Sequence, residues 1–387
     1  MKYDFDEIIE RKNTNSFKYE GARLMEPGLP EDFIPLWVAD MDFACAQPIL
    51  DAMKERIDKR ILGYSDALNE GYHEAVIGWM NKRFHWEVKK EELRCSAGVV
   101  PALSNLVRLL TKKGDKVMFF TPSYGPFNRV TEKNGRCPVF CRLKETNGYY
   151  QIDFDDMKNK IEQEQVKLLI LCSPHNPTGR VFTEEELRRI GDICDNHHVA
   201  IICDEIHHDL VRCNLHHISL ASLYPGADWI YTCTAPSKTF NLAGNQLSDI
   251  VIPNKAIREI WDEKYSYMPN PVSLAATEAA YTKCEDWVEE LNQYLDGNFK
   301  MMKEFLEEKL PAIRFEIPEG TYLGWMHMEG TGLDEQEIQR RFISQAGLFV
   351  EKGEMFVDNA RFCIRVNVAC PRAILKKALE RMEKVFA

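Results

Sequence analysis

The middle of the chain contains short runs of consecutive apolar residues separated by amphipathic segments. Continuous apolar runs, rather than alternating ones, are typical of parallel strands buried on both faces of a sheet. Between two of these runs, Thr183 and Glu186 form a capping-box pattern that predicts the start of an amphipathic helix. Strand, helix and strand in succession predict an α/β fold with a mostly parallel sheet. The predicted strands lie at 116–124, 166–174, 199–207, 228–237 and 249–254.

The pattern changes near residue 285. A long helix is predicted over 286–310, followed by a strand pair with a turn near Glu319 and Gly320 and by a helix over 333–346. Residues 360–370 alternate as a half-buried strand does, and a last helix follows Pro371. This mixture predicts a smaller α+β domain. We therefore expect three parts: an N-terminal segment that packs with the small domain (1–45), a large α/β domain (46–284) and the small C-terminal domain (285–387).

Composition narrows the class of protein. Of the 387 residues, 45% are apolar and 28% charged, as in ordinary globular proteins. The net charge is −11 with no basic tract, which argues against nucleic acid or an anionic membrane as a partner. No apolar run is long enough for a bilayer span, and the N-terminus lacks the apolar region of a signal peptide. The 12 scattered cysteines predict reduced thiols in a cytoplasmic protein rather than a disulfide scaffold.

Polar side chains follow four of the predicted strands, each at the strand's carboxyl end. They are Tyr124, Asn176, Asp204 and Lys238. Ligands of parallel α/β sheets bind beyond these ends, so we expect the four side chains to share one crevice. Each also has an ordinary explanation: core packing, a turn, a helix cap and a surface charge, respectively. Their convergence at neighbouring strand ends favours a site.

A helix is predicted to begin near Pro101, directly after a turn of small residues. Proline suits a first helical position. The free N–H groups of Val99 and Val100, together with the helix dipole, predict an anion-binding site beside Gly98. The segment matches neither a GxGxxG nor a Walker pattern, and by itself it is a weak signal.

These parts together suit pyridoxal 5′-phosphate (PLP). Lys238 is suited to form a Schiff base with the aldehyde. A carboxylate at Asp204 keeps a pyridine nitrogen protonated. Asn176 can donate a hydrogen bond to the phenolic oxygen, and the ring of Tyr124 can stack on the cofactor. The phosphate belongs at Val99 and Val100.

Four stretches resemble the fold-type I PLP enzymes, the class I/II aminotransferase superfamily. They are "SAGVVPAL", "SPHNPTGRVF", "DEIHHDL" and "APSKTFNLAG". The resemblance runs nearly end to end and implies a large domain with a mostly parallel sheet of the seven-stranded type, plus a smaller α+β domain. "IPLWVADMDF", "GYSD", "DEIHHDL" and "CIRVNVACPR" further resemble the MalY/PatB branch of cystathionine β-lyases and C–S lyases.

This resemblance extends the set of site residues. It implies that Arg365 binds the α-carboxylate of an amino-acid substrate, together with Asn176 and next to Val38 and Ala39. The alternation along 362–368 independently separates Arg365 from the apolar side chains, although a rim salt bridge is the alternative. Tyr64 resembles a tyrosine that reaches the cofactor phosphate of the neighbouring subunit, which implies a homodimer with shared active sites.

Lys238, Tyr64 and Tyr124 form the expected catalytic set, and His207 and Ser237 join the cofactor contacts. Two positions depart from the family pattern: Gln246 stands where many members have an arginine for the phosphate, and Ala235 where a hydroxyl is common. Phosphate binding is then expected to depend more on Val99, Val100, Ser237 and Tyr64.

The histidines of "CDEIHHDLVRCNLHH" do not have the spacing of zinc ligands, so no metal is expected. Only His207 is placed near the cofactor, and the other histidines are expected on a helix or loop surface. Three functions remain open. The first is a C–S β-lyase that converts an S-substituted L-cysteine to pyruvate, ammonia and a thiol. The second is an aminotransferase, and the third is a PLP-bearing module that binds a regulatory protein.

Overall fold

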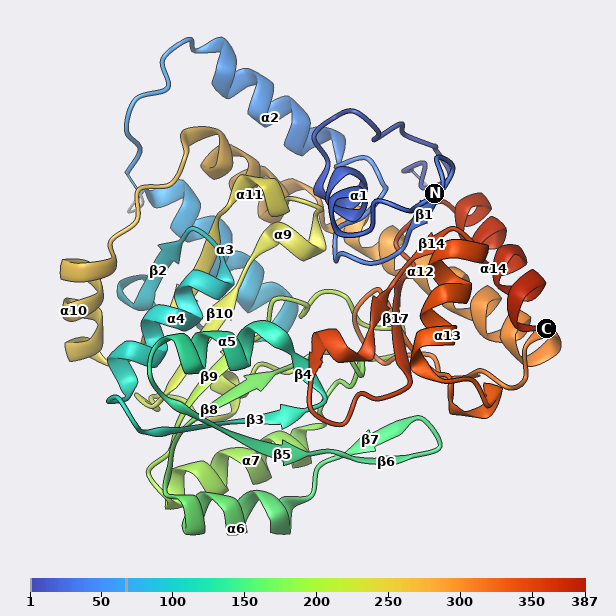
Figure 1. The fold of residues 1–387 in the computed structure, drawn as a ribbon. Helices are drawn as coiled ribbons and strands as arrows, with labels where there is room; N and C mark the ends of the chain where they lie inside the picture. The colour runs from blue at the N-terminus through green and yellow to red at the C-terminus, as the bar shows by residue number, and fades with distance from the viewer. Residues whose placement is uncertain (1, 67–68) are drawn as a thin grey trace.

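The computed structural model describes residues 2–66 and 69–387, and a seven-stranded sheet forms its centre (Figure 1). Six strands are parallel, and β11 alone runs antiparallel to both of its neighbours. The α/β fold predicted from the apolar runs is confirmed. In spatial order the strands are β2 (Leu93–Ser96), β11 (Ser248–Val251), β10 (Ile230–Thr234), β9 (Ala200–Asp204), β8 (Val166–Cys172), β3 (Lys116–Thr121) and β5 (Cys137–Arg142).

The strands of this sheet are shorter than the sequence predicted. The expected strand over 116–124 is divided at Pro122 into β3 and a separate short strand, β4 (Ser123–Tyr124), which pairs with β16 (Phe356–Val357). The expected strand over 199–207 ends at Asp204. In each case the residues beyond the end leave the ladder, so that their polar side chains no longer follow the sheet's up-and-down alternation.

Helices cover both faces of the sheet. The capping box at Thr183 and Glu186 is present and starts α7 (Glu184–Asn196), as predicted. α4 (Val99–Leu110) begins two residues before the predicted start, and its buried face packs on β2 and β9–β11. The remaining helices of this part are α2 (Gln47–Asp58), α3 (Glu70–Phe84), α5 (Gly125–Lys133), α6 (Phe154–Glu164), α8 (Leu220–Leu223), α9 (Pro236–Thr239), α10 (Lys255–Tyr265) and α11 (Pro271–Lys283).

A second, antiparallel sheet lies at the C-terminal side of the molecule (Figure 1). Its order is β12 (Arg314–Phe315), β13 (Leu323–His327), β17 (Cys363–Asn367) and β15 (Glu351–Lys352). The long helix α12 (Glu285–Lys309) and the last helix α14 (Arg372–Phe386) pack against each other beside it. The predicted helix over 333–346 is α13 (Glu335–Arg340), extended by a π-helical turn over Arg341–Gln345.

The N-terminal residues lie against this second part of the chain. β1 (Ile34–Pro35) pairs in parallel with β14 (Leu348–Phe349), and Asn367 N donates a hydrogen bond to Leu36 O. Trp37 contacts the ring of Phe349 edge-on, at a centroid distance of 5.1 Å. The chain leaving β1 therefore runs from the small sheet toward the carboxyl edge of the large one.

Candidate active site

A cavity of about 220 Å³ lies at the carboxyl edge of the large sheet. It collects the predicted site residues except Tyr64: Val38, Ala39, Val99, Val100, Tyr124, Asn176, Asp204, His207, Ser237, Lys238 and Arg365. The strand order explains this convergence. β10, β9, β8 and β3 are successive parallel neighbours, so the segments that follow them emerge side by side and bring Lys238, Asp204, Asn176 and Tyr124 together.

Lys238 lies on the single helical turn α9 and faces the cavity. Its Nζ donates a hydrogen bond of 2.6 Å to Ala39 O. Burial lowers the pKa of Lys238 to about 8, with the nearby positive charge of Arg365 acting in the same direction, whereas Asp40 and Asp204 oppose the shift. At neutral pH a measurable fraction of this amine is therefore unprotonated and nucleophilic.

Asp204 is the last residue of β9, and its carboxyl group is buried. Its Oδ1 accepts a hydrogen bond of 3.3 Å from Ile206 N. Burial raises the pKa of Asp204 to about 7, an effect that the charge of Lys238 only partly offsets. A buried carboxylate is stabilised when a cation is placed beside it. Asp204 is therefore suited to receive a protonated ring nitrogen.

Arg365 reaches the cavity from β17 and is almost fully buried. Its Nη1 donates a hydrogen bond of 2.7 Å to Asn176 Oδ1, and its guanidinium forms an ion pair with Glu351. Burial lowers the pKa of Arg365 to about 10, so it remains charged at neutral pH. The alternation along 362–368 predicted that Arg365 points away from the apolar side chains of its strand, and its side chain does border the cavity. Glu351 was missed, because no sequence motif marks a residue that reaches the site only through strand pairing.

The first turn of α4 also lines the cavity. Gly98 is its N-cap with φ of 136°, a conformation that favours glycine, and α4 has no side-chain cap. Ala97 to Val100 and Gln246 border the same space. An uncapped helix start directs free N–H groups and the positive end of the dipole at a ligand. This corner therefore suits a phosphate group.

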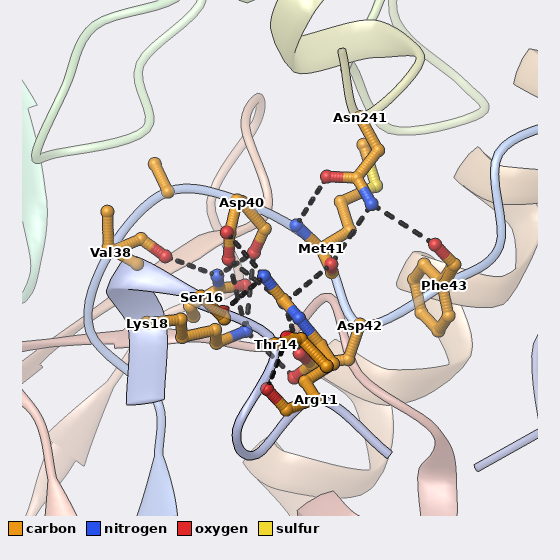
Figure 2. Close-up of polar contacts among 12 residues, drawn as sticks. Arg11, Thr14, Ser16, Lys18, Val38, Asp40, Met41, Asp42, Phe43 and Asn241 are labelled. Atoms are coloured by element: carbon orange, nitrogen blue, oxygen red, sulfur yellow. Dashed lines mark hydrogen bonds and ion pairs between the residues drawn. The ribbon is translucent and has the colours of Figure 1, made fainter. Parts of the chain in front are cut away.

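Val38 and Ala39 form one wall of the cavity. They begin a stretch over residues 38–43, which we call the entrance segment (Figure 2). Asn241 brackets it: its Oδ1 accepts from Met41 N, and its Nδ2 donates to Met41 O and Phe43 O, all at 3.0–3.1 Å. Asn367 Nδ2 donates to Val38 O at 2.8 Å and to Asp40 O at 2.6 Å. Asn241 lies three residues after Lys238, just beyond the end of α9, and Asn367 lies two residues after Arg365 on β17. The segments of the chain that carry Lys238 and Arg365 therefore also hold this wall.

A partly buried ion-pair network holds the outer side of the entrance segment (Figure 2). Lys18 is fully buried, and its Nζ lies 2.8 Å from Asp42 Oδ2. Arg11 forms ion pairs of 2.8 Å with Asp40 and 2.6 Å with Asp42, and donates to Met41 O at 3.0 Å. Both acidic residues stand in "WVADMDF", but nothing in the sequence marked Arg11 and Lys18 as their partners, because the contacts form only after folding.

Tyr64 lies outside the cavity, and 95% of its surface is exposed. It borders a separate hollow of about 710 Å³ between α2, α3 and α11. Within one chain the structure therefore does not bring Tyr64 to the other predicted residues.

The expectation that the histidines other than His207 lie on the surface is wrong for His208 and His217, which are buried. His217 Nε2 lies 3.1 Å from Glu205 Oε2, and His208 packs on the ring of Phe84. Polar partners and ring contacts allow histidine to be buried in this way. Across 2–66 and 69–387, no group of three or more His, Cys, Asp or Glu side chains is arranged to hold a metal ion.

The residues present fit PLP. Three features surround one cavity. The lysine with a lowered pKa suits the aldehyde, and the buried carboxyl group suits a protonated ring nitrogen. The uncapped helix start suits the phosphate. The fold and this cavity define the class of fold-type I PLP-dependent enzymes.

Comparison with known proteins agrees with this class. Residues 31–382 match the family "Aminotransferase class I and II", and the chain belongs to this family. It is 38% identical over 389 residues to cystathionine beta-lyase PatB of Bacillus subtilis, covering 99% of this chain and 100% of the relative. The resemblance to the MalY/PatB branch is thereby confirmed.

Solved structures give the same result. The PLP-bound C–S lyase of Staphylococcus hominis superposes with a TM-score of 0.95 at 41% identity, covering 100% of this chain and 98% of that one. Cystalysin of Treponema denticola, which contains PLP, superposes with a TM-score of 0.96 at 35% identity, with 100% and 99% covered.

Proposed function

We propose that this protein is a PLP-dependent C–S β-lyase that converts an S-substituted L-cysteine and water to pyruvate, ammonia and a thiol. The observation that carries the proposal is the cavity in which Lys238, Asp204 and Arg365 meet. Three of the relatives with 35–41% identity over the whole chain are named cystathionine beta-lyase, C–S lyase and cystalysin, which favours elimination over transamination.

Each residue has a distinct task in this reaction. When bound, PLP forms a covalent bond with an amine and withdraws electrons from the adjacent carbon. Asp204 holds the proton on the ring nitrogen, and Asn176 and Tyr124 orient the ring. Arg365 holds the substrate carboxylate and so fixes which bond of Cα faces Lys238. Lys238 Nζ, with its pKa lowered to about 8, takes the Cα proton. The sulfur then leaves from Cβ.

The phosphate contacts follow from the helix start and its neighbours. The N–H groups of Val99 and Val100 and the hydroxyl of Ser237 hold the phosphate, and Gln246 offers an amide where an arginine is common in the family. His207 borders the same cavity and is kept neutral because burial lowers its pKa, so it would be a neutral contact of the bound cofactor. Val38 and Ala39 close the substrate side.

The active unit is a homodimer in this proposal. Tyr64 is exposed beside the exposed apolar side chains Ile57, Ile61 and Leu62, a grouping that favours a protein interface. A second copy seated there would bring its Tyr64 to the phosphate of the first.

The protein acts in the cytoplasm, since nine of its 12 cysteines are buried free thiols, which suits a reducing compartment. Within the described ranges, no helix is long and apolar enough to cross a membrane.

The test is a product assay with L-cystathionine and L-cysteine. We expect pyruvate, ammonia and a free thiol over many turnovers without an added keto acid. Turnover that stops after one equivalent of cofactor and resumes only when a keto acid is added would establish an aminotransferase instead. The Lys238→Ala protein is the matched control, because it lacks the proposed base.

A further inference from the structure

Glu351 and Arg365 are direct cross-strand neighbours at the wall of the cavity. β15 and β17 are antiparallel, and their register places Glu351 opposite Arg365. The two side chains form an ion pair, and both border the cavity. Side chains at such opposed positions start only about 5 Å apart, so this contact follows from the register itself.

The ion pair occupies the part of the guanidinium that a substrate needs. Nη1 of Arg365 donates to Asn176 Oδ1, Nη2 contacts Glu351 and, at 3.4 Å, Trp37 O, and the buried Nε has no hydrogen-bond partner. A carboxylate binds arginine through two parallel N–H bonds. The two forks that a guanidinium offers are Nη1 with Nη2 and Nε with Nη2. Each fork uses one N–H of Nη2, and Nη2 already contacts Glu351 and Trp37 O, so a substrate carboxylate must compete with Glu351 for this nitrogen.

We propose that Glu351 is an internal competitor for the carboxylate site, which must move off Nη2 of Arg365 when a substrate α-carboxylate binds. This inference rests on the part of the proposed function that assigns the α-carboxylate to Arg365. A buried guanidinium without an anion is unfavourable, and Glu351 supplies that anion in the absence of a ligand.

The competition has a consequence for product release. It weakens the binding of every carboxylate by a similar factor, so it does not change the ratio of their affinities. An amino acid has a second contact through its amine, which reacts with the cofactor, and it can bind well despite this penalty. Pyruvate keeps the carboxylate but has lost the amine, so Glu351 favours its release.

The test compares Glu351→Gln with the unchanged holoenzyme. Glutamine keeps the length of the side chain and an oxygen that can accept from Arg365, but it removes the negative charge. We expect the Kd of propionate, measured by isothermal titration calorimetry, to fall by about tenfold or more, because a like charge beside a binding site strongly opposes a ligand. The effect on turnover should be a lower KM rather than a changed kcat. Glu351→Ala should change the Kd in the same direction.

Two further variants serve as references. Glu354→Gln removes a charge from an exposed residue of the same connection, one that pairs with Lys352, and should leave the Kd of propionate unchanged. Arg365→Gln should abolish propionate binding. An unchanged or raised Kd in Glu351→Gln, with binding lost in Arg365→Gln, overturns this inference alone. Propionate binding that survives in Arg365→Gln overturns the assignment of Arg365 and the inference with it. Failure of the lyase assay affects neither result, since propionate binding does not depend on the reaction.

Discussion

Lys238 Nζ donates a hydrogen bond of 2.6 Å to the carbonyl oxygen of Ala39, which also accepts one of 2.9 Å from the Tyr322 hydroxyl. Ala39 belongs to the entrance segment, and Lys238 follows a strand at the centre of the large sheet. The contact therefore joins the reactive amine to the wall that closes the substrate side. The network of Figure 2 fixes that wall from behind, so it contributes to the position of Lys238.

Lys238 is expected to carry the cofactor covalently. Borohydride reduction of the PLP-loaded protein, followed by peptide mapping, should place the label on Lys238, because its lowered pKa and its position in the cavity make it the nucleophile. Lys238→Arg keeps the positive charge and should show no label. Label on another lysine would refute this assignment.

Asp204 is expected to make the stability of the cofactor-free protein depend on pH. The folded-state pKa of Asp204, about 7, lies above the usual 3.8. Its contribution to the free energy of unfolding is therefore fully present below pH 3.8 and is lost as the pH rises through about 7. The loss amounts to at most about 4 kcal/mol. The Tm of Asp204→Asn minus that of the unchanged protein should therefore grow between pH 5 and pH 8.

The pKa of Lys238 is lowered, so its contribution to stability is lost in the opposite direction, as pH falls through about 8. Lys238 is present in both proteins, so its effect largely cancels in the Tm difference. A Tm difference that is flat with pH would show that Asp204 is not the titrating group.

With PLP bound, the unchanged protein should be the more stable of the two, because Asp204→Asn should hold the cofactor weakly. The variant should also lose elimination by several orders of magnitude.

Asp42→Asn is expected to destabilise the protein strongly. It removes the closest anion of the fully buried Lys18, and breaking a buried pair in this way costs about 3–5 kcal/mol. Glu259→Gln breaks an exposed pair with Lys255 on α10 and should cost less than about 1 kcal/mol. Urea unfolding measures both changes. Equal small losses in the two variants would mean that the network does not hold the entrance segment.

Tyr64 is expected to act on the site of the partner subunit. Lys238→Ala and Tyr64→Phe proteins, each weakly active or inactive, should regain activity when mixed and allowed to exchange subunits. In the mixed dimer one site carries both changes and the other neither. Activity and the fraction of mixed dimer, from differently tagged chains, can be measured together. A fully exchanged sample no more active than its parents would argue against shared sites.

The residues of the site that follow the parallel strands were predictable from the sequence. Buried parallel strands appear as continuous apolar runs, and their carboxyl ends meet at one edge, so Asn176, Asp204 and Lys238 could be grouped without coordinates. The helix start after Gly98 was also predictable, and its uncapped N–H groups are those that the sequence suggested for an anion. The local sequence pattern therefore determined three things: the mostly parallel large sheet, the edge at which its polar residues meet, and PLP as the cofactor.

Other features were decided only by the tertiary structure. The pairing of Glu351 with Arg365 depends on the register of two antiparallel strands, and that of Lys18 with Asp42 on the path of the N-terminal segment across the small sheet. The burial of His208 and His217 likewise depends on what packs over them. A local pattern reports a residue's own periodicity and caps, whereas these contacts join positions far apart in the chain, whose distance is set by the packing of whole elements.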